Sequence, residues 1–120
     1  MTDVKKSPAE VLEAAADLLE KPGAWMQEDY CDTGGYYAKS LQQASCWCIV
    51  GAIGAVADMD GPDAEEWANK VLGPLIPGVE EGYPVTGVPG WNDKEGRTQA
   101  EVVAALREAA RQASIRRGEA

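Results

Sequence analysis

The sequence of 120 residues contains no histidine. This absence excludes Ser-His-Asp triads, Cys-His dyads and histidine metal sites, because no other side chain ordinarily titrates near neutral pH. Basic side chains are also few, with 11 Lys and Arg against 20 Asp and Glu, and the net charge is −9. Residues 1–90 hold 15 acidic and 5 basic side chains, whereas residues 91–120 hold 5 and 6. Direct nucleic-acid binding is not expected, because it needs clustered Lys and Arg.

Cysteine is scarce and odd in number, with three residues, and no apolar run follows the N-terminus as it does in a signal peptide. Both features favour a reducing, cytoplasmic location. Residues 40–57 carry no charge, but their continuous apolar part, 46–57, is too short for a membrane span and suits a buried helix. No phosphate-binding glycine motif occurs, and three cysteines leave zinc without a fourth ligand, so no cofactor or metal is expected.

The chain does contain the signals of a small helical domain. One domain over residues 1–120 is expected, with an ordered core at about 7–115. Capping boxes that begin at Ser7 and Thr98 predict the starts of the first and last helices. A second helix is predicted at about 45–58, with Ser45 as its N-cap.

The rest of the chain is punctuated by Gly and Pro. A third helix is predicted to begin at Pro62 and to end before Gly73-Pro74. Aromatic residues on both sides of a Gly-Gly pair predict a short β-hairpin within 24–43. Residues 73–97 lack a periodic pattern and predict a long ordered loop, a feature that is often functional. The expected fold class is mainly α (α+β), with four helices, and the first and last helices packed against the second.

The Cys46-Trp47-Cys48 segment has two interpretations. In the first turn of a helix, Cys46 or Cys48 would be a reactive thiol, because the helix dipole lowers a thiol pKa. The favoured interpretation is a core segment, because free cysteine is among the most buried residue types and no Lys or Arg lies nearby.

A second candidate site lies in the loop before the last helix. As a recognition loop it would use Tyr83 or Trp91 as a hot spot, with Asn92 in the turn and Asp93 and Arg97 as polar contacts. The alternative is an anchored turn, because Asn and Asp bond back to the backbone and a Trp ring buries a large area. The structural alternative is favoured.

Three segments in combination resemble one family of small bacterial and phage proteins, which is catalogued as a domain of unknown function. They are LLEKPGAW at 18–25, SCWCIVGA at 45–52 and WNDKEGRTQAEV at 91–102. The resemblance covers about residues 8–113 and implies one compact domain of phage or bacterial origin. It implies no reaction.

These observations favour a small acidic interaction protein that binds a protein partner, in the form of a phage- or mobile-element-encoded modulator of a host protein. An enzyme is the less favoured class, and its version here is a cysteine-dependent enzyme or redox protein that uses Cys46 or Cys48. A third hypothesis is an acidic nucleic-acid mimic that occupies a basic groove.

Overall fold

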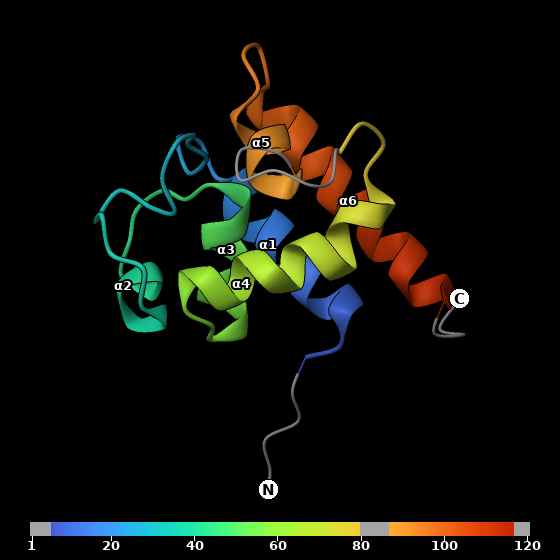
Figure 1. The fold of residues 1–120 in the computed structure, drawn as a ribbon, viewed down its shortest axis with the longest axis horizontal. Coiled ribbons are helices and arrows are strands. Elements are labelled where there is room, and N and C mark those ends of the chain that lie inside the picture. Colours follow the sequence, from blue (N-terminus) through green and yellow to red (C-terminus); the bar gives the residue numbers. More distant parts are fainter. Residues whose placement is uncertain (1–5, 80–86, 117–120) are drawn as a thin grey trace, which may run out of the picture.

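The computed structural model describes residues 6–79 and 87–116, which contain six α-helices (Figure 1). The helices are α1 (Pro8–Glu20), α2 (Ala38–Gln42), α3 (Ile49–Ala57), α4 (Gly61–Trp67), α5 (Gly87–Asp93) and α6 (Gln99–Arg116). From α4 the chain continues directly into a π-helix, η1 (Ala68–Leu72), and a 3₁₀ helix, η2 (Gly73–Leu75). The expected mainly helical class is confirmed.

Both predicted capping boxes are present. Ser7 Oγ accepts from the backbone N–H of Glu10 at 3.2 Å, and Glu10 Oε1 accepts from the N–H of Ser7 at 2.8 Å. The N–H of Glu101 donates to Thr98 Oγ1 at 3.2 Å, and the N–H of Thr98 donates to Glu101 Oε1 at 2.9 Å. These reciprocal bonds satisfy N–H groups that a helix start otherwise leaves without partners.

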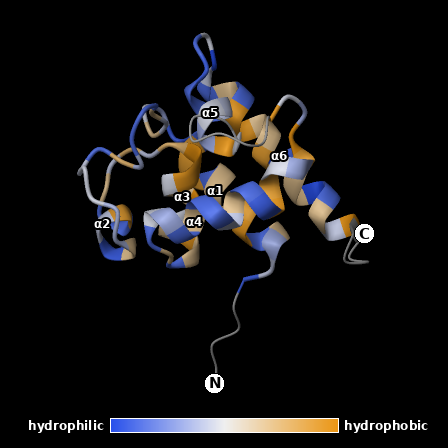
Figure 2. Cartoon of the chain, viewed as in Figure 1, coloured by the Kyte–Doolittle hydropathy of each residue, from blue (hydrophilic) through white to orange (hydrophobic). Residues whose placement is uncertain are grey.

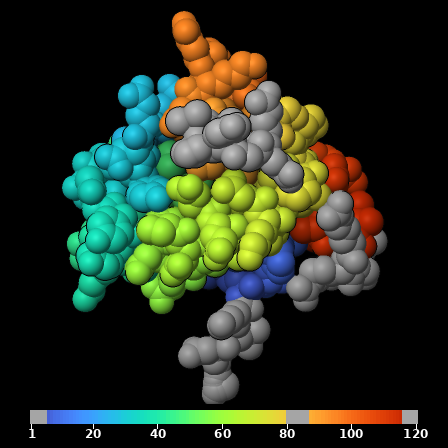
Figure 3. Space-filling model, in the orientation of Figure 1, coloured from blue at the N-terminus to red at the C-terminus, as the bar shows by residue number. Residues whose placement is uncertain are grey.

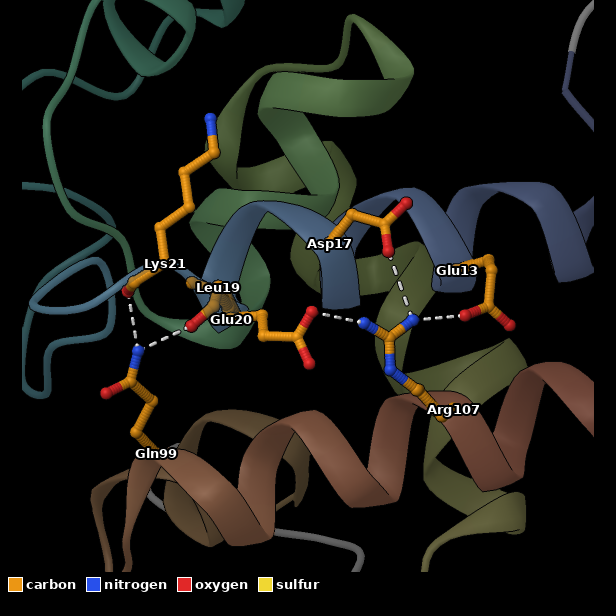
Figure 4. Close-up of polar contacts among 7 residues, drawn as sticks. All are labelled: Glu13, Asp17, Leu19, Glu20, Lys21, Gln99 and Arg107. Carbon is orange, nitrogen blue, oxygen red and sulfur yellow. Dashed lines mark hydrogen bonds and ion pairs between the residues drawn. The ribbon is translucent and has the colours of Figure 1, made fainter.

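The last helix packs against the first rather than against α3, which corrects one expectation. Helices α1 and α6 lie antiparallel (Figure 4), and Gln99 Nε2 donates at 2.7 Å to the carbonyls of both Leu19 and Lys21 at the end of α1. Arg107 of α6 pairs with three carboxylates of α1, those of Glu13, Asp17 and Glu20. Helix α3 contacts α1, α2, α4 and α5.

Helix α3 begins at Ile49, four residues after the predicted N-cap. Residue Cys48 is the N-cap, and its Sγ accepts from the N–H of Gly51 at 3.4 Å. Residues 46–48 are not helical because their backbone pairs with the 24–32 loop: the carbonyl of Cys46 accepts from the N–H of Asp32 at 3.2 Å, and Trp47 forms bridges with Trp25 and Cys31. Asp32 Oδ1 also accepts from the N–H groups of Ser45 and Cys46, at 2.9 and 3.3 Å. The prediction of Ser45 as the cap was wrong, because a segment distant in sequence pairs with the backbone of residues 46–48.

The predicted β-hairpin is also wrong. Within the described residues, the segment after α1 pairs with Trp47 and not with itself. The N–H of Trp47 donates to the carbonyl of Ala24 at 2.7 Å, and the Trp47 carbonyl accepts from Met26 at 2.9 Å. On the other side of Trp47, the N–H of Cys48 donates to the carbonyl of Tyr30 at 3.1 Å. Residues 24–32 therefore wrap around residues 46–48 as an irregular loop.

The predicted long loop at 73–97 contains helical structure. It includes η2 and α5, while residues 80–86 lie outside the described part. Gly87 has a φ of 76°, and the N–H of Val88 donates to Asn69 Oδ1 at 2.9 Å, so an asparagine from η1 binds the start of α5. The sequence did not predict α5, because the helix contains Gly and Pro, which both have poor helix propensity.

Leu12 of α1, Ile53 of α3 and Leu106 of α6 are fully buried. Figure 2 shows α3 as a mostly hydrophobic helix in the middle of the fold. Helix α3 approaches the 24–32 loop so closely that a Cβ at Gly51 would lie 1.8 Å from the carbonyl oxygen of Tyr30. Only glycine fits there. No helix within residues 6–79 and 87–116 has the length and hydropathy needed to span a membrane.

Candidate binding site

The Trp91-Asn92-Asp93 segment is at the C-terminal end of α5, and Asn92 is the buried polar residue of the described core, with 0% exposure. Its Oδ1 accepts from Trp25 Nε1 at 2.8 Å and from the N–H of Ile49 at 3.0 Å. Its Nδ2 donates to the carbonyl of Met26 at 3.2 Å and to Asp93 Oδ1 at 2.9 Å. Asn92 thus joins α5 to the 24–32 loop and to the first residue of α3.

The neighbouring polar groups strengthen this junction. Gln27 Nε2 donates to the carbonyls of Asn92 and Lys94, both at 3.1 Å. Asp93 Oδ1 accepts from the N–H of Glu28 at 2.9 Å. Glu28 has a φ of 77°, a conformation that few non-glycine residues adopt, and this bond helps to hold it there.

Trp91 and Arg97 form a contact of their own. The Arg97 guanidinium lies 3.9 Å from the Trp91 ring centroid, and Arg97 Nε donates to the Trp91 carbonyl at 2.9 Å. Only 13% of the Arg97 side chain is exposed, and it also pairs with Glu101. Through these contacts, both residues attach α5 to the start of α6. Tyr83, the other aromatic candidate, lies outside the described residues.

The three cysteines are free thiols in a common region. Cys31 and Cys48 are buried, whereas Cys46 is half-buried with its Sγ 3.7 Å from Met26 Sδ. Burial raises the pKa of Cys48 to about 12. Burial, followed by the negative charge of Asp32, raises the pKa of Cys46. Neither thiol has an environment that favours the thiolate.

A cavity of about 220 Å³ lies beside this junction, between the 24–32 loop, α4 and α5. Four carboxylates line it, from Glu28, Asp29, Glu65 and Asp93, together with Tyr30, Cys48, Val50 and Pro89. The cavity therefore has acidic groups on several elements and apolar groups from the core. Of the residues proposed from sequence, it contains Asp93 and Cys48, but not Trp91, Asn92, Arg97 or Cys46.

Hydrogen bonds orient the carboxylates of this acidic cavity. Tyr30 Oη donates to Glu65 Oε1 at 3.1 Å, and Asp29 Oδ1 accepts from the N–H of Tyr30 at 2.8 Å. Asp93 is held by the N–H of Glu28, as described above. A carboxylate has room for several hydrogen bonds, so each retains capacity to accept from a ligand. Burial, then the Glu65 carboxylate, raises the pKa of Tyr30 to about 12, so its phenol is a neutral donor.

Two other hollows lack this arrangement. A groove of about 600 Å³ between α1 and α6 includes Glu13 and Arg111, but Glu13 pairs with Arg107, and Arg111 pairs with Glu108. A third hollow, of about 400 Å³, is lined by Glu20, Gln99 and small apolar residues of α6. Among the described residues, no group of three Cys, Asp or Glu side chains is placed to hold a metal ion.

Sequence reasoning missed Glu28, Asp29, Tyr30 and Glu65. Nothing local distinguishes them, because acidic residues at a helix start or in a loop are ordinarily explained by solvation and capping. The tertiary contact between Tyr30 and Glu65, 35 residues apart, is what brings the two segments together.

The fold and the site define a small helical domain in which hydrogen bonds join α5 to the irregular 24–32 loop, beside an acidic cavity. Residues 3–112 match a family described as "Family of unknown function (DUF6197)", and the chain belongs to that family. The resemblance to an uncharacterised family is thereby confirmed. Comparison with curated proteins and with solved structures gives no significant match.

Proposed function

We propose that this chain is a non-enzymatic binding domain whose acidic cavity takes up a basic side chain of a partner protein. The observation that supports this most directly is the lining of the cavity, in which the described residues include four with carboxylates and no Lys or Arg. A cationic side chain there would find carboxylate acceptors on three segments, and charge-assisted hydrogen bonds are stronger than neutral ones. The net charge of −9 would also speed encounter with a basic partner.

The size and lining of the cavity favour arginine as the guest. Its volume of about 220 Å³ is below the range of roughly 300–1,000 Å³ usual for whole small-molecule ligands, but it suits one side chain. Pro89 and the Tyr30 ring, both half-buried, offer apolar surface to the aliphatic stem. The planar guanidinium then presents up to five N–H donors to carboxylates on different elements.

The cysteine-dependent alternative has less support. Burial raises the pKa of Cys48 to about 12, so the neutral thiol dominates at pH 7, whereas the nucleophile is the thiolate. Cys48 also serves as the N-cap of α3, which gives it a structural task. The phage or bacterial origin implied by the family resemblance favours a host protein as the partner, with the chain as its modulator.

The test uses two short peptides, acetyl-Gly-Arg-Gly-amide and the same peptide with citrulline, which keeps the shape of arginine but has no charge. Each is titrated into ¹⁵N-labelled protein, and amide shifts are followed by NMR. We expect saturable shifts at Glu28–Tyr30, Glu65 and Asp93 with the arginine peptide alone. Shifts spread over acidic residues remote from the cavity, such as Asp17 on α1 and Glu101 on α6, would show unspecific charge binding and refute the proposal.

A matched pair of variants sharpens this test. Glu65→Gln removes one charge from the cavity and keeps an oxygen that can accept from Tyr30 Oη. Glu66→Gln removes the same charge from the adjacent residue, whose side chain is 71% exposed and pairs with Lys70. We expect Glu65→Gln to weaken arginine-peptide binding about tenfold, and Glu66→Gln to weaken it less than twofold. Equal effects would mean that net charge, and not the cavity, binds the peptide.

A further inference from the structure

Tyr36 and Tyr37 form an exposed aromatic pair just before α2. Their side chains are 47% and 58% exposed, which is unusual for large aromatic residues. The ring centroids lie 4.5 Å apart with an interplanar angle of 31°, and Tyr36 Oη donates to Tyr37 Oη at 3.3 Å. The two rings therefore support each other but leave much of their surface to solvent.

The backbone beneath the pair is fixed on both sides. The carbonyl of Tyr36 accepts from the N–H of Gly61 at 2.6 Å, and that of Tyr37 accepts from the N–H of Leu41 at 2.9 Å. The N–H of Ala38 donates to Asp60 Oδ1 at 2.8 Å. A rigid aromatic surface loses little conformational entropy when a partner binds, which is a property of interface hot spots.

The aromatic pair is connected to the acidic cavity through α4. Gly61, which bonds to Tyr36, lies under the Tyr30 ring, since a Cβ at Gly61 would be 2.6 Å from Tyr30 Cε2. One helical turn further, Glu65 binds the Tyr30 hydroxyl in the cavity. In Figure 3 the helix formed by α4 and η1 occupies the centre of the viewed face, with the 24–45 segment beside it. This backbone path of one helical turn and one hydrogen-bonded step is roughly 10 Å long, a length that about three residues of extended chain cover.

The charges around the pair favour a cation. Asp60 lies next to it, and Asp58 and Asp63 flank the same turn, whereas Lys39 on α2 is the basic residue close in sequence. The faces of aromatic rings are negative and attract guanidinium groups, with arginine the commoner partner. This chain already contains such a contact, between Arg97 and Trp91.

We propose that Tyr36 and Tyr37 are the second contact of one binding surface, where they stack against an arginine of a basic partner segment. This inference rests on the proposed function, since the partner's first arginine occupies the acidic cavity. The partner chemistry is therefore an extended segment with two arginines about three residues apart. The aromatic pair contributes by cation–π stacking, and the cavity contributes by charge.

The test compares two peptides, acetyl-Arg-Gly-Gly-Arg-amide and acetyl-Gly-Gly-Gly-Arg-amide, with the native chain and with a Tyr36→Ala/Tyr37→Ala variant. We expect the native chain to bind the two-arginine peptide more tightly by about three- to tenfold. The alanine variant should lose this advantage and bind the one-arginine peptide as the native chain does. Because both rings are exposed and their hydroxyls bond to each other, the variant should fold normally, as circular dichroism would check.

A conservative variant separates stacking from hydrogen bonding. Tyr36→Phe/Tyr37→Phe keeps both ring faces and should keep the two-arginine advantage. An alanine variant that retains the advantage overturns the inference about the aromatic pair. If the native chain does not bind the one-arginine peptide, the proposed arginine binding in the acidic cavity is refuted instead. The failures of the two proposals are therefore distinguishable.

Discussion

Asn92→Ala should be among the most damaging single substitutions in this chain, because the Asn92 amide joins three segments inside the core. The change leaves the N–H of Ile49, the Nε1 of Trp25 and the carbonyl of Met26 without a partner. A buried group that loses its partner costs about 1–3 kcal/mol. Ile49 is fully buried and takes the whole cost, whereas Trp25 and Met26 are half-buried and take part of it.

The sum is a loss of about 3–5 kcal/mol, a large share of the roughly 5–15 kcal/mol that stabilise an ordinary domain. Urea denaturation followed by tryptophan fluorescence measures it, since Trp25 itself reports the loss of contact. The control is Asn69→Ala, which removes the one bond that the N–H of Val88 donates to the exposed Asn69 side chain and should cost about 1 kcal/mol. A loss at Asn92 of less than about 1 kcal/mol, or no larger than the loss at Asn69, would refute this account of the junction.

Asn92→Asp gives the same prediction a pH dependence. The replacement keeps Oδ1 but turns the Nδ2 donor into an acceptor that faces the carbonyl of Met26 and the carboxylate of Asp93. Burial and a neighbouring like charge both raise a carboxyl pKa, so the variant's folded-state pKa lies above the unfolded value. Its stability relative to the native chain should therefore be better at pH 4 than at pH 7, because protonation restores a donor.

Three further outcomes are expected. A Gly→Ala change within a helix ordinarily stabilises it by about 1 kcal/mol. Gly51→Ala should instead destabilise the protein by at least about 3 kcal/mol in the same urea assay, because the new Cβ meets the Tyr30 carbonyl. A stabilised variant would contradict this close approach. In native protein at pH 7, a thiol reagent should modify Cys46 first and Cys48 only on unfolding, and rapid labelling of Cys48 would contradict its burial. Tyrosinate absorbance should show Tyr30 titrating near pH 12 and at lower pH in Glu65→Gln, and stability should fall above about pH 10, because the folded pKa is raised above the unfolded one.

The helices that carry local start signals could be predicted from sequence. Ser7 and Thr98 begin capping boxes whose partners lie three residues away, so the information is local and the prediction succeeded. Helix α3 was predicted from its apolar composition, but its first residue was set by the 24–32 loop, whose backbone pairs with residues 46–48 and keeps them extended. A local pattern has no means of showing that contact.

The site was only partly predictable for the same reason. The sequence pointed to Trp91, Asn92 and Asp93, and the structure gives Asn92 four side-chain bonds, three of them to residues more than 40 positions away. The acidic cavity depends on the contact between Tyr30 and Glu65. The local sequence around neither residue predicts this contact. The sequence pattern could identify the residues of the α5 end of the junction. The groups to which they bond depend on the tertiary fold.

Asp93 links these two parts of the molecule, and its position has a consequence for the proposed function. One oxygen, Oδ1, accepts from Asn92 Nδ2 and from the N–H of Glu28, and the same carboxylate lines the acidic cavity. A bound guanidinium would draw on a group that also fastens α5 to the 24–32 loop. Any ligand that binds only the folded junction stabilises it by mass action. Saturating arginine peptide should therefore raise the melting temperature of the native chain, and it should do so less in Asp93→Asn, where the carboxylate charge is gone but the turn can still form.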